Sequence, residues 1–139
     1  MSTPNRSASE DALVLIVDDF RDGREMYAEF LRSAGFRVVE AENGQQALDL
    51  AFTLSPSIIL MDLSLPVMDG LSAIRALHGD PRSASIPLVA LSAHSRDDSV
   101  SAATRAGCAA FLEKPCSPEA LLLAVRTLLS SRSRGTPAR

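Results

Sequence analysis

The chain has 139 residues, a formal net charge of −3 at pH 7, and a composition of 46% apolar and 22% charged residues. This length suits one globular domain with one core, and a pI near 5.3 supplies no basic field for nucleic acid. No apolar run approaches the roughly 18 residues of a membrane span, and Met1 to Glu10 lacks a signal-peptide core, so the expected location is cytoplasmic.

Strand-like and helix-like segments alternate five times between Leu13 and Leu129. The predicted strands are 12–17, 36–41, 58–62, 87–92 and 109–112, and the predicted helices are 24–34, 44–52, 69–77, 97–106 and 118–129. This alternation predicts an α/β fold with a parallel sheet wrapped by helices. We expect a domain over residues 11–130, a disordered segment over 1–10 and a flexible tail over 131–139.

Side-chain spacing predicts which helix faces are buried. On the first helix Met26, Phe30 and Leu31 follow helical spacing, whereas the helix 97–106 is apolar mainly through alanine and should be loosely held. The two cysteines, Cys108 and Cys116, have no metal-ligand spacing and are expected to be small, partly buried free thiols.

Asp62 is the residue that most needs an explanation. It ends the uninterrupted apolar run 58–61, which is typical of a strand covered on both faces, and a carboxylate in such surroundings requires a partner. In parallel α/β sheets, ligands and chemistry collect at the carboxyl ends of the strands.

Other polar residues follow the remaining strands at the same predicted edge. Asp18 and Asp19 follow the first strand, Ser92 ends the fourth, and Lys114, the single lysine beside thirteen arginines, follows the fifth. Three neighbouring carboxylates favour either protonation or a hard cation, and oxygen-only ligands suit Mg²⁺. A lysine can reach one phosphate oxygen as a compact charge, so the pattern indicates a magnesium-assisted phosphoryl site.

Each of these residues also has a simpler explanation when taken alone. Asp18 and Asp19 could be charges at a helix N-terminus, Ser92 could be a turn residue, and Lys114 could be an ordinary surface lysine. Their joint placement at successive strand ends favours the site.

Five segments of the sequence resemble the receiver domain of two-component response regulators over about residues 11–130. These segments are 17–19, 41–44, 61–70, 91–93 and 113–115. The resemblance implies a flavodoxin-like (βα)5 doubly wound sandwich with parallel strands in the order 2-1-3-4-5. It also implies a cis Lys114–Pro115 bond.

The resemblance assigns a role to each residue at the edge. Asp62 would accept a phosphoryl group, Lys114 and Ser92 would bind its oxygens, and the magnesium ligands would be Asp19, Asp62 and the Ser64 backbone carbonyl, with Asp18 acting through water. Ser92 and Phe111 would form the switch. Phe111 departs from the commoner tyrosine, so its movement would depend on burial alone. Ser64 and His94 would influence the lifetime of the phosphate, although His94 could equally be an ordinary loop residue.

The function predicted from the sequence is a single-domain response regulator that is phosphorylated by a histidine kinase or a histidine phosphotransfer protein, and is not itself classed as an enzyme. Its downstream partner would bind a surface made by helix 97–106, the fifth strand and the last helix. A monomer is expected, with dimerisation on phosphorylation left open. The alternatives are a receiver from a hybrid histidine kinase, a relay phosphate sink, and, less favoured, an aspartyl-nucleophile phosphatase.

Overall fold

The structure is a computed structural model that describes residues 12–65, 68–93 and 97–135. The segment 1–10, predicted to be disordered, therefore lies outside the described residues, and so do positions 94–96 with His94. Within the described part of the chain, no helix has the length and apolar character needed to cross a bilayer. The cytoplasmic location stays a prediction.

Five strands and five helices alternate along the chain. The strands are β1 (Leu13–Val17), β2 (Arg37–Ala41), β3 (Ile58–Asp62), β4 (Leu88–Ser92) and β5 (Ala110–Glu113). The helices are α2 (Arg21–Ser33), α3 (Gly44–Leu54), α4 (Gly70–His78), α5 (Asp97–Ala106) and α6 (Pro118–Gly135). The strands form one parallel sheet in the order β2-β1-β3-β4-β5, which confirms the predicted fold class and strand order.

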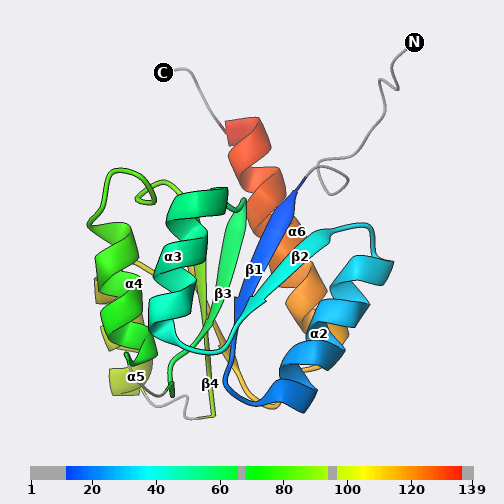
Figure 1. Ribbon diagram of the computed structural model, residues 1–139, viewed down its shortest axis with the longest axis horizontal. Coiled ribbons are helices and arrows are strands. Elements are labelled where there is room, and N and C mark those ends of the chain that lie inside the picture. Colours follow the sequence, from blue (N-terminus) through cyan, green and yellow to red (C-terminus); the bar gives the residue numbers. More distant parts are fainter. Residues whose placement is uncertain (1–11, 66–67, 94–96, 136–139) are drawn as a thin grey trace.

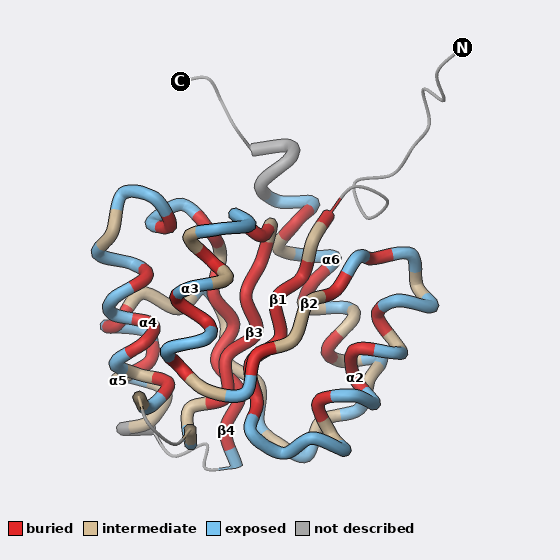
Figure 2. Tube along the Cα trace, in the orientation of Figure 1, coloured by how far each residue is buried: buried red, intermediate tan, exposed pale blue. Residues whose placement is uncertain are grey.

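The helices cover both faces of the sheet, with α3, α4 and α5 on one side and α2 and α6 on the other (Figure 1). Consecutive residues of a strand point to opposite faces, so β3 contributes Ile59 and Met61 to one core and Ile58 and Leu60 to the other. All five residues of β3 are buried, and the sheet is the most deeply buried layer (Figure 2). This two-sided covering places the end of β3 at a protected edge.

Local sequence signals set most of the helix boundaries. Asn43 and Asp69 cap α3 and α4, since their side chains accept hydrogen bonds from the amides of Gln46 and Ser72. Ser117 does the same at the start of α6 by accepting from the Ala120 amide. These caps lie where the sequence predicts them.

Two boundaries differ from the prediction. The helix α2 begins at Arg21 rather than Arg24, and its N-cap Phe20 makes no side-chain capping bond, so the sequence has no capping signal there. The helix α6 continues to Gly135, five residues into the predicted flexible tail. Neither proline nor glycine interrupts residues 130–134, so the helix propagates until that glycine.

The buried face of α2 is also different from the predicted one. It consists of Arg24, Tyr27, Ala28 and Leu31, while Met26 is 46% exposed. The prediction that Met26 lies on the core face is therefore wrong, and the helix instead buries two polar side chains. Cys108 and Cys116 are free and partly buried, as predicted.

Candidate functional site

Three carboxylates meet at the carboxyl edge of the sheet. Asp18 and Asp19 directly follow β1, and Asp62 is the last residue of β3, which pairs with β1 in parallel. One carboxylate oxygen from each of the three lies within 4.8 Å of the others. Asp18 and Asp62 are buried and Asp19 is exposed, so the cluster has a buried floor and a side open to solvent.

The Asp62 carboxylate is 5% exposed and is held by a nearby backbone amide. Its Oδ1 accepts a hydrogen bond of 3.0 Å from the Ser64 amide. Burial raises the pKa of Asp62 to about 6, an effect to which Asp18 adds and which the Ser64 amide and Lys114 oppose. A carboxylate with such a pKa keeps more basicity than a solvated aspartate and is still largely ionised at neutral pH.

Lys114 connects the end of β5 to this cluster. Its Nζ donates a hydrogen bond of 2.8 Å to Asp18 Oδ2 and lies 3.6 Å from Asp62 Oδ2. Burial lowers the pKa of Lys114, but the bond to Asp18 and the charges of both aspartates outweigh burial and raise the pKa overall. The side chain is therefore a fixed ammonium between two carboxylates. The following Lys114–Pro115 bond is cis, as the resemblance implies.

Ser92 and Phe111 occupy neighbouring strands. Ser92 ends β4, is 4% exposed, and its carbonyl accepts a hydrogen bond of 2.7 Å from the Lys114 amide. Phe111 lies in β5 and packs, partly buried, against the core beneath α3, α4 and α5. The fold thus brings Ser92 to the same edge as the carboxylates, while the switch role of both residues stays a prediction.

Two predicted residues remain without a geometric test of their roles. Ser64 lies exposed in the loop after β3, where its amide bonds to Asp62, and its carbonyl as a metal ligand stays a prediction. His94 lies outside the described residues.

Sequence reasoning missed two supporting residues on α2. The Arg24 guanidinium donates from Nη1 to the Asp18 carbonyl at 2.9 Å and from Nε to Glu40 at 2.8 Å. The Tyr27 hydroxyl donates to the Cys116 carbonyl at 2.8 Å. A signal existed, since positions 24, 27, 28 and 31 have the i, i+3, i+4, i+7 spacing of a buried helix face.

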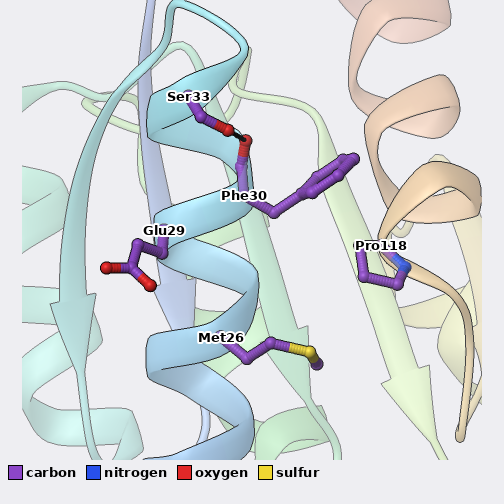
Figure 3. Close-up of a pocket in the computed structure, with 5 residues that line it drawn as sticks. All are labelled: Met26, Glu29, Phe30, Ser33 and Pro118. Carbon is purple, nitrogen blue, oxygen red and sulfur yellow. Dashed lines mark hydrogen bonds between the residues drawn. The ribbon is translucent and has the colours of Figure 1, made fainter.

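An apolar surface borders the carboxylates. A cleft of about 310 Å³ contains Asp18 and Lys114 at one end and is otherwise lined by Phe20, Gly23, Met26, Tyr27, Ala93 and Pro115. A second groove, of about 380 Å³, shares Met26 with it and runs between α2 and the start of α6. In Figure 3 the side chains of Met26 and Phe30 project toward Pro118 across this groove, whereas Glu29 points away.

The donor set at the edge fits a hard divalent cation. Three carboxylates within 4.8 Å of one another repel, and the described side chains that could coordinate a metal there supply oxygen alone. The pKa of Asp62, raised to about 6, shows that its anionic form lacks full compensation from the protein. A magnesium ion would supply the missing positive charge.

The chain belongs to the response regulator receiver domain family, whose model matches residues 14–126. It is 34% identical over 122 residues to the phosphate regulon transcriptional regulatory protein PhoB of Pseudomonas aeruginosa, covering 88% of this chain and 53% of that protein, so it spans about half of PhoB.

Two further similarities span nearly the whole of the other protein. The polar-differentiation response regulator DivK of Brucella anthropi is 29% identical, over 84% of this chain and 94% of DivK. The receiver domain of the sensor histidine kinase PA1611 from P. aeruginosa PAO1, whose structure has a magnesium ion in the active-site cleft, is 30% identical. It superimposes with a TM-score of 0.80 over 86% of this chain and 98% of that one.

Proposed function

We propose that this chain is a single-domain response regulator that accepts a phosphoryl group on Asp62 from a phosphohistidine of a kinase or phosphotransfer protein. An Asp62 carboxylate oxygen forms the new bond to phosphorus, the phosphorus–nitrogen bond breaks, and the imidazole leaves with its electron pair and takes up a proton. The observation that carries this proposal is the convergence of Asp62 with Lys114, 3.6 Å away, and with two further aspartates.

Each group at the edge has a task in this transfer. Lys114 supplies a point charge for a phosphoryl oxygen, and Asp19, Asp62 and the Ser64 carbonyl would hold magnesium, with Asp18 acting through water. Bound Mg²⁺ would neutralise part of the charge on the transferring group. The Lys114–Asp18 ion pair keeps the ammonium beside Asp62 before the donor arrives.

The response would begin at Ser92 and Phe111. A phosphoryl group on Asp62 offers new acceptor oxygens, and Ser92 at the end of the neighbouring β4 is close enough in the fold to turn toward them. Phe111 would then move inward and change the surface made by α5, β5 and α6. Ser64 and His94 would tune how long the phosphate lasts.

The donor protein would dock on the α2 side of the edge. A phosphohistidine must bring its phosphorus to Asp62, so its protein must cover the surface that borders Asp18 and Lys114. That surface carries Phe20, which is 62% exposed, and Met26, together with the groove of Figure 3. Exposed apolar side chains next to the site favour a partner that buries them.

Incubation with acetyl phosphate and Mg²⁺, followed by intact-protein mass spectrometry, tests the assignment. We expect a gain of one phosphoryl group that requires Mg²⁺ and is lost in Asp62→Asn. Asp49→Asn, an exposed aspartate on α3, is the matched control and should be phosphorylated normally.

One outcome would favour the phosphatase alternative instead. Such an enzyme would turn over p-nitrophenyl phosphate many times, and turnover that survives Asp62→Asn would refute the phosphoacceptor role. The relay alternatives share the chemistry at Asp62, and the PA1611 receiver belongs to a histidine kinase. Phosphotransfer profiling against purified kinases and phosphotransfer proteins separates them by the donor that reacts fastest.

A further inference from the structure

Tyr27 is the single tyrosine of the chain, and it is buried with its hydroxyl committed to one contact. The side chain is 5% exposed, and the hydroxyl donates a hydrogen bond of 2.8 Å to the Cys116 carbonyl. The same oxygen lies 3.7 Å from the Cys116 thiol. These two residues are 89 positions apart, so the bond connects α2 to the loop between β5 and α6.

That loop begins with Lys114. Cys116 comes two residues after the lysine, and Tyr27, Lys114 and Pro115 all line the apolar cleft next to Asp18. The carbonyl that Tyr27 holds is therefore separated from the Lys114 backbone by a single proline. On the other side of the lysine, its own amide is held by the Ser92 carbonyl of β4.

The same helix also holds the partner of the lysine. Arg24 lies one turn before Tyr27 on the buried face of α2, and it bonds to the Asp18 carbonyl. Asp18 in turn accepts the hydrogen bond from Lys114. The two buried polar side chains of α2 thus bind the two loops that carry the two ends of this ion pair.

We propose that Tyr27 is a positioning residue for Lys114, whose ammonium it keeps at the phosphoacceptor edge by anchoring the loop at the Cys116 carbonyl. This inference rests on the proposed function for its consequence, which is faster phosphoryl transfer, but its structural part can be measured without phosphorylation. Tyr27→Phe removes the hydroxyl and keeps the buried ring, so it is the appropriate variant.

The matched control is a second buried hydroxyl far from the site. Ser83 is 1% exposed and its hydroxyl donates to the Leu77 carbonyl at the end of α4. Ser83→Ala also removes a buried hydroxyl-to-carbonyl bond, so it reports what general loosening of the fold does. Melting temperatures of both variants establish that each remains folded.

The structural readout uses the single lysine. In protein grown with ¹³C,¹⁵N-lysine, one ε-methylene signal reports the order of the Lys114 side chain. We expect its order parameter to fall in Tyr27→Phe and to stay at the wild-type value in Ser83→Ala. An unchanged order parameter in Tyr27→Phe overturns the inference.

The kinetic readout is phosphorylation by acetyl phosphate with saturating Mg²⁺. Loss of one neutral hydrogen bond corresponds to about a five-fold slower maximal rate, with little change in the acetyl phosphate concentration that gives half of it. In a Lys114→Ala background, the same Tyr27→Phe change should have no further effect. An equal loss with and without the lysine would show a merely structural role and overturn the inference.

The two readouts separate the two proposals. If wild-type protein takes up no phosphoryl group, the proposed function fails, and the lysine order parameter alone decides whether Tyr27 positions Lys114. If wild-type protein is phosphorylated and Tyr27→Phe matches it in both readouts, only the inference fails.

Discussion

The Asp62 carboxylate makes folding depend on pH. Burial raises its pKa from 3.8 to about 6, so between these values the folded chain holds a proton that the unfolded chain releases. Stability is therefore lost as the pH rises through this window. Without Mg²⁺, we expect the stability advantage of Asp62→Asn over wild type to grow by roughly 2 kcal/mol from pH 4 to pH 7.5.

Urea unfolding of both proteins at several pH values in chelator measures this difference. Subtracting the variant cancels the other acids, such as Asp80, whose pKa is lowered to about 2 by Arg82. A difference that does not vary with pH would contradict the raised pKa of Asp62.

Gly70 is required by the close approach of α4 to the end of β3. A Cβ at this position would overlap the Asp62 carbonyl oxygen and the Leu63 Cα, both of which are backbone atoms. We expect Gly70→Ala to cost about 1–3 kcal/mol of stability and to slow phosphorylation by displacing Asp62. Gly79→Ala is the control, since its Cβ would meet only the Arg75 carbonyl, at 3.2 Å. Equal stability losses in the two variants, measured by urea unfolding, would count against this account.

At the scale of elements, α2 is joined to the sheet by a buried ion pair. The Arg24–Glu40 side chains are 9% and 23% exposed, and Arg24 also satisfies the Asp18 carbonyl. Arg24→Met would leave both acceptors without this donor, so we expect a loss of about 2 kcal/mol together with weaker Mg²⁺ binding.

The matched control lies on the same helix. Arg21 pairs with Glu25, but these side chains are 77% and 50% exposed, and such pairs contribute about 0.5 kcal/mol or less. Arg21→Met should therefore leave stability and Mg²⁺ binding nearly unchanged. Calorimetric titration with Mg²⁺ tests the second effect, and wild-type affinity in Arg24→Met would refute the link between Arg24 and the acidic edge.

At the scale of the whole molecule, a ligand that binds the folded chain alone must stabilise it. The three carboxylates converge only after β1 and β3 have paired, so the unfolded chain has no equivalent site. We expect Mg²⁺ at 100 times its dissociation constant to add about 2.7 kcal/mol of stability. The melting temperature should rise with Mg²⁺ concentration at pH 7.5.

Asp19→Asn tests which residues are responsible. Asp19 is exposed, so its replacement should cost little folding energy while removing most of the response to Mg²⁺. Asp22→Asn changes another exposed acid three residues further along and should keep the response. A wild-type melting shift in Asp19→Asn would exclude this residue as a ligand.

The sequence by itself determined the alternation of strands and helices, the parallel sheet and the edge where polar residues gather. Those features come from short-range patterns: uninterrupted apolar runs such as 58–61 predict buried strands, and residues such as Asn43 and Ser117 mark helix starts. Because parallel strands share one carboxyl edge, the meeting of Asp18, Asp62 and Lys114 also followed from the pattern.

Only the tertiary structure decided which polar groups support that edge. The buried face of α2 could not be read correctly from apolar residues, because Arg24 and Tyr27 are buried and Met26 is not. Their burial depends on acceptors elsewhere in the chain, the nearest in sequence being the Asp18 carbonyl and the most distant the Cys116 carbonyl, 89 positions from Tyr27. A polar side chain is buried where a partner satisfies it, and that partner exists only once the chain has folded.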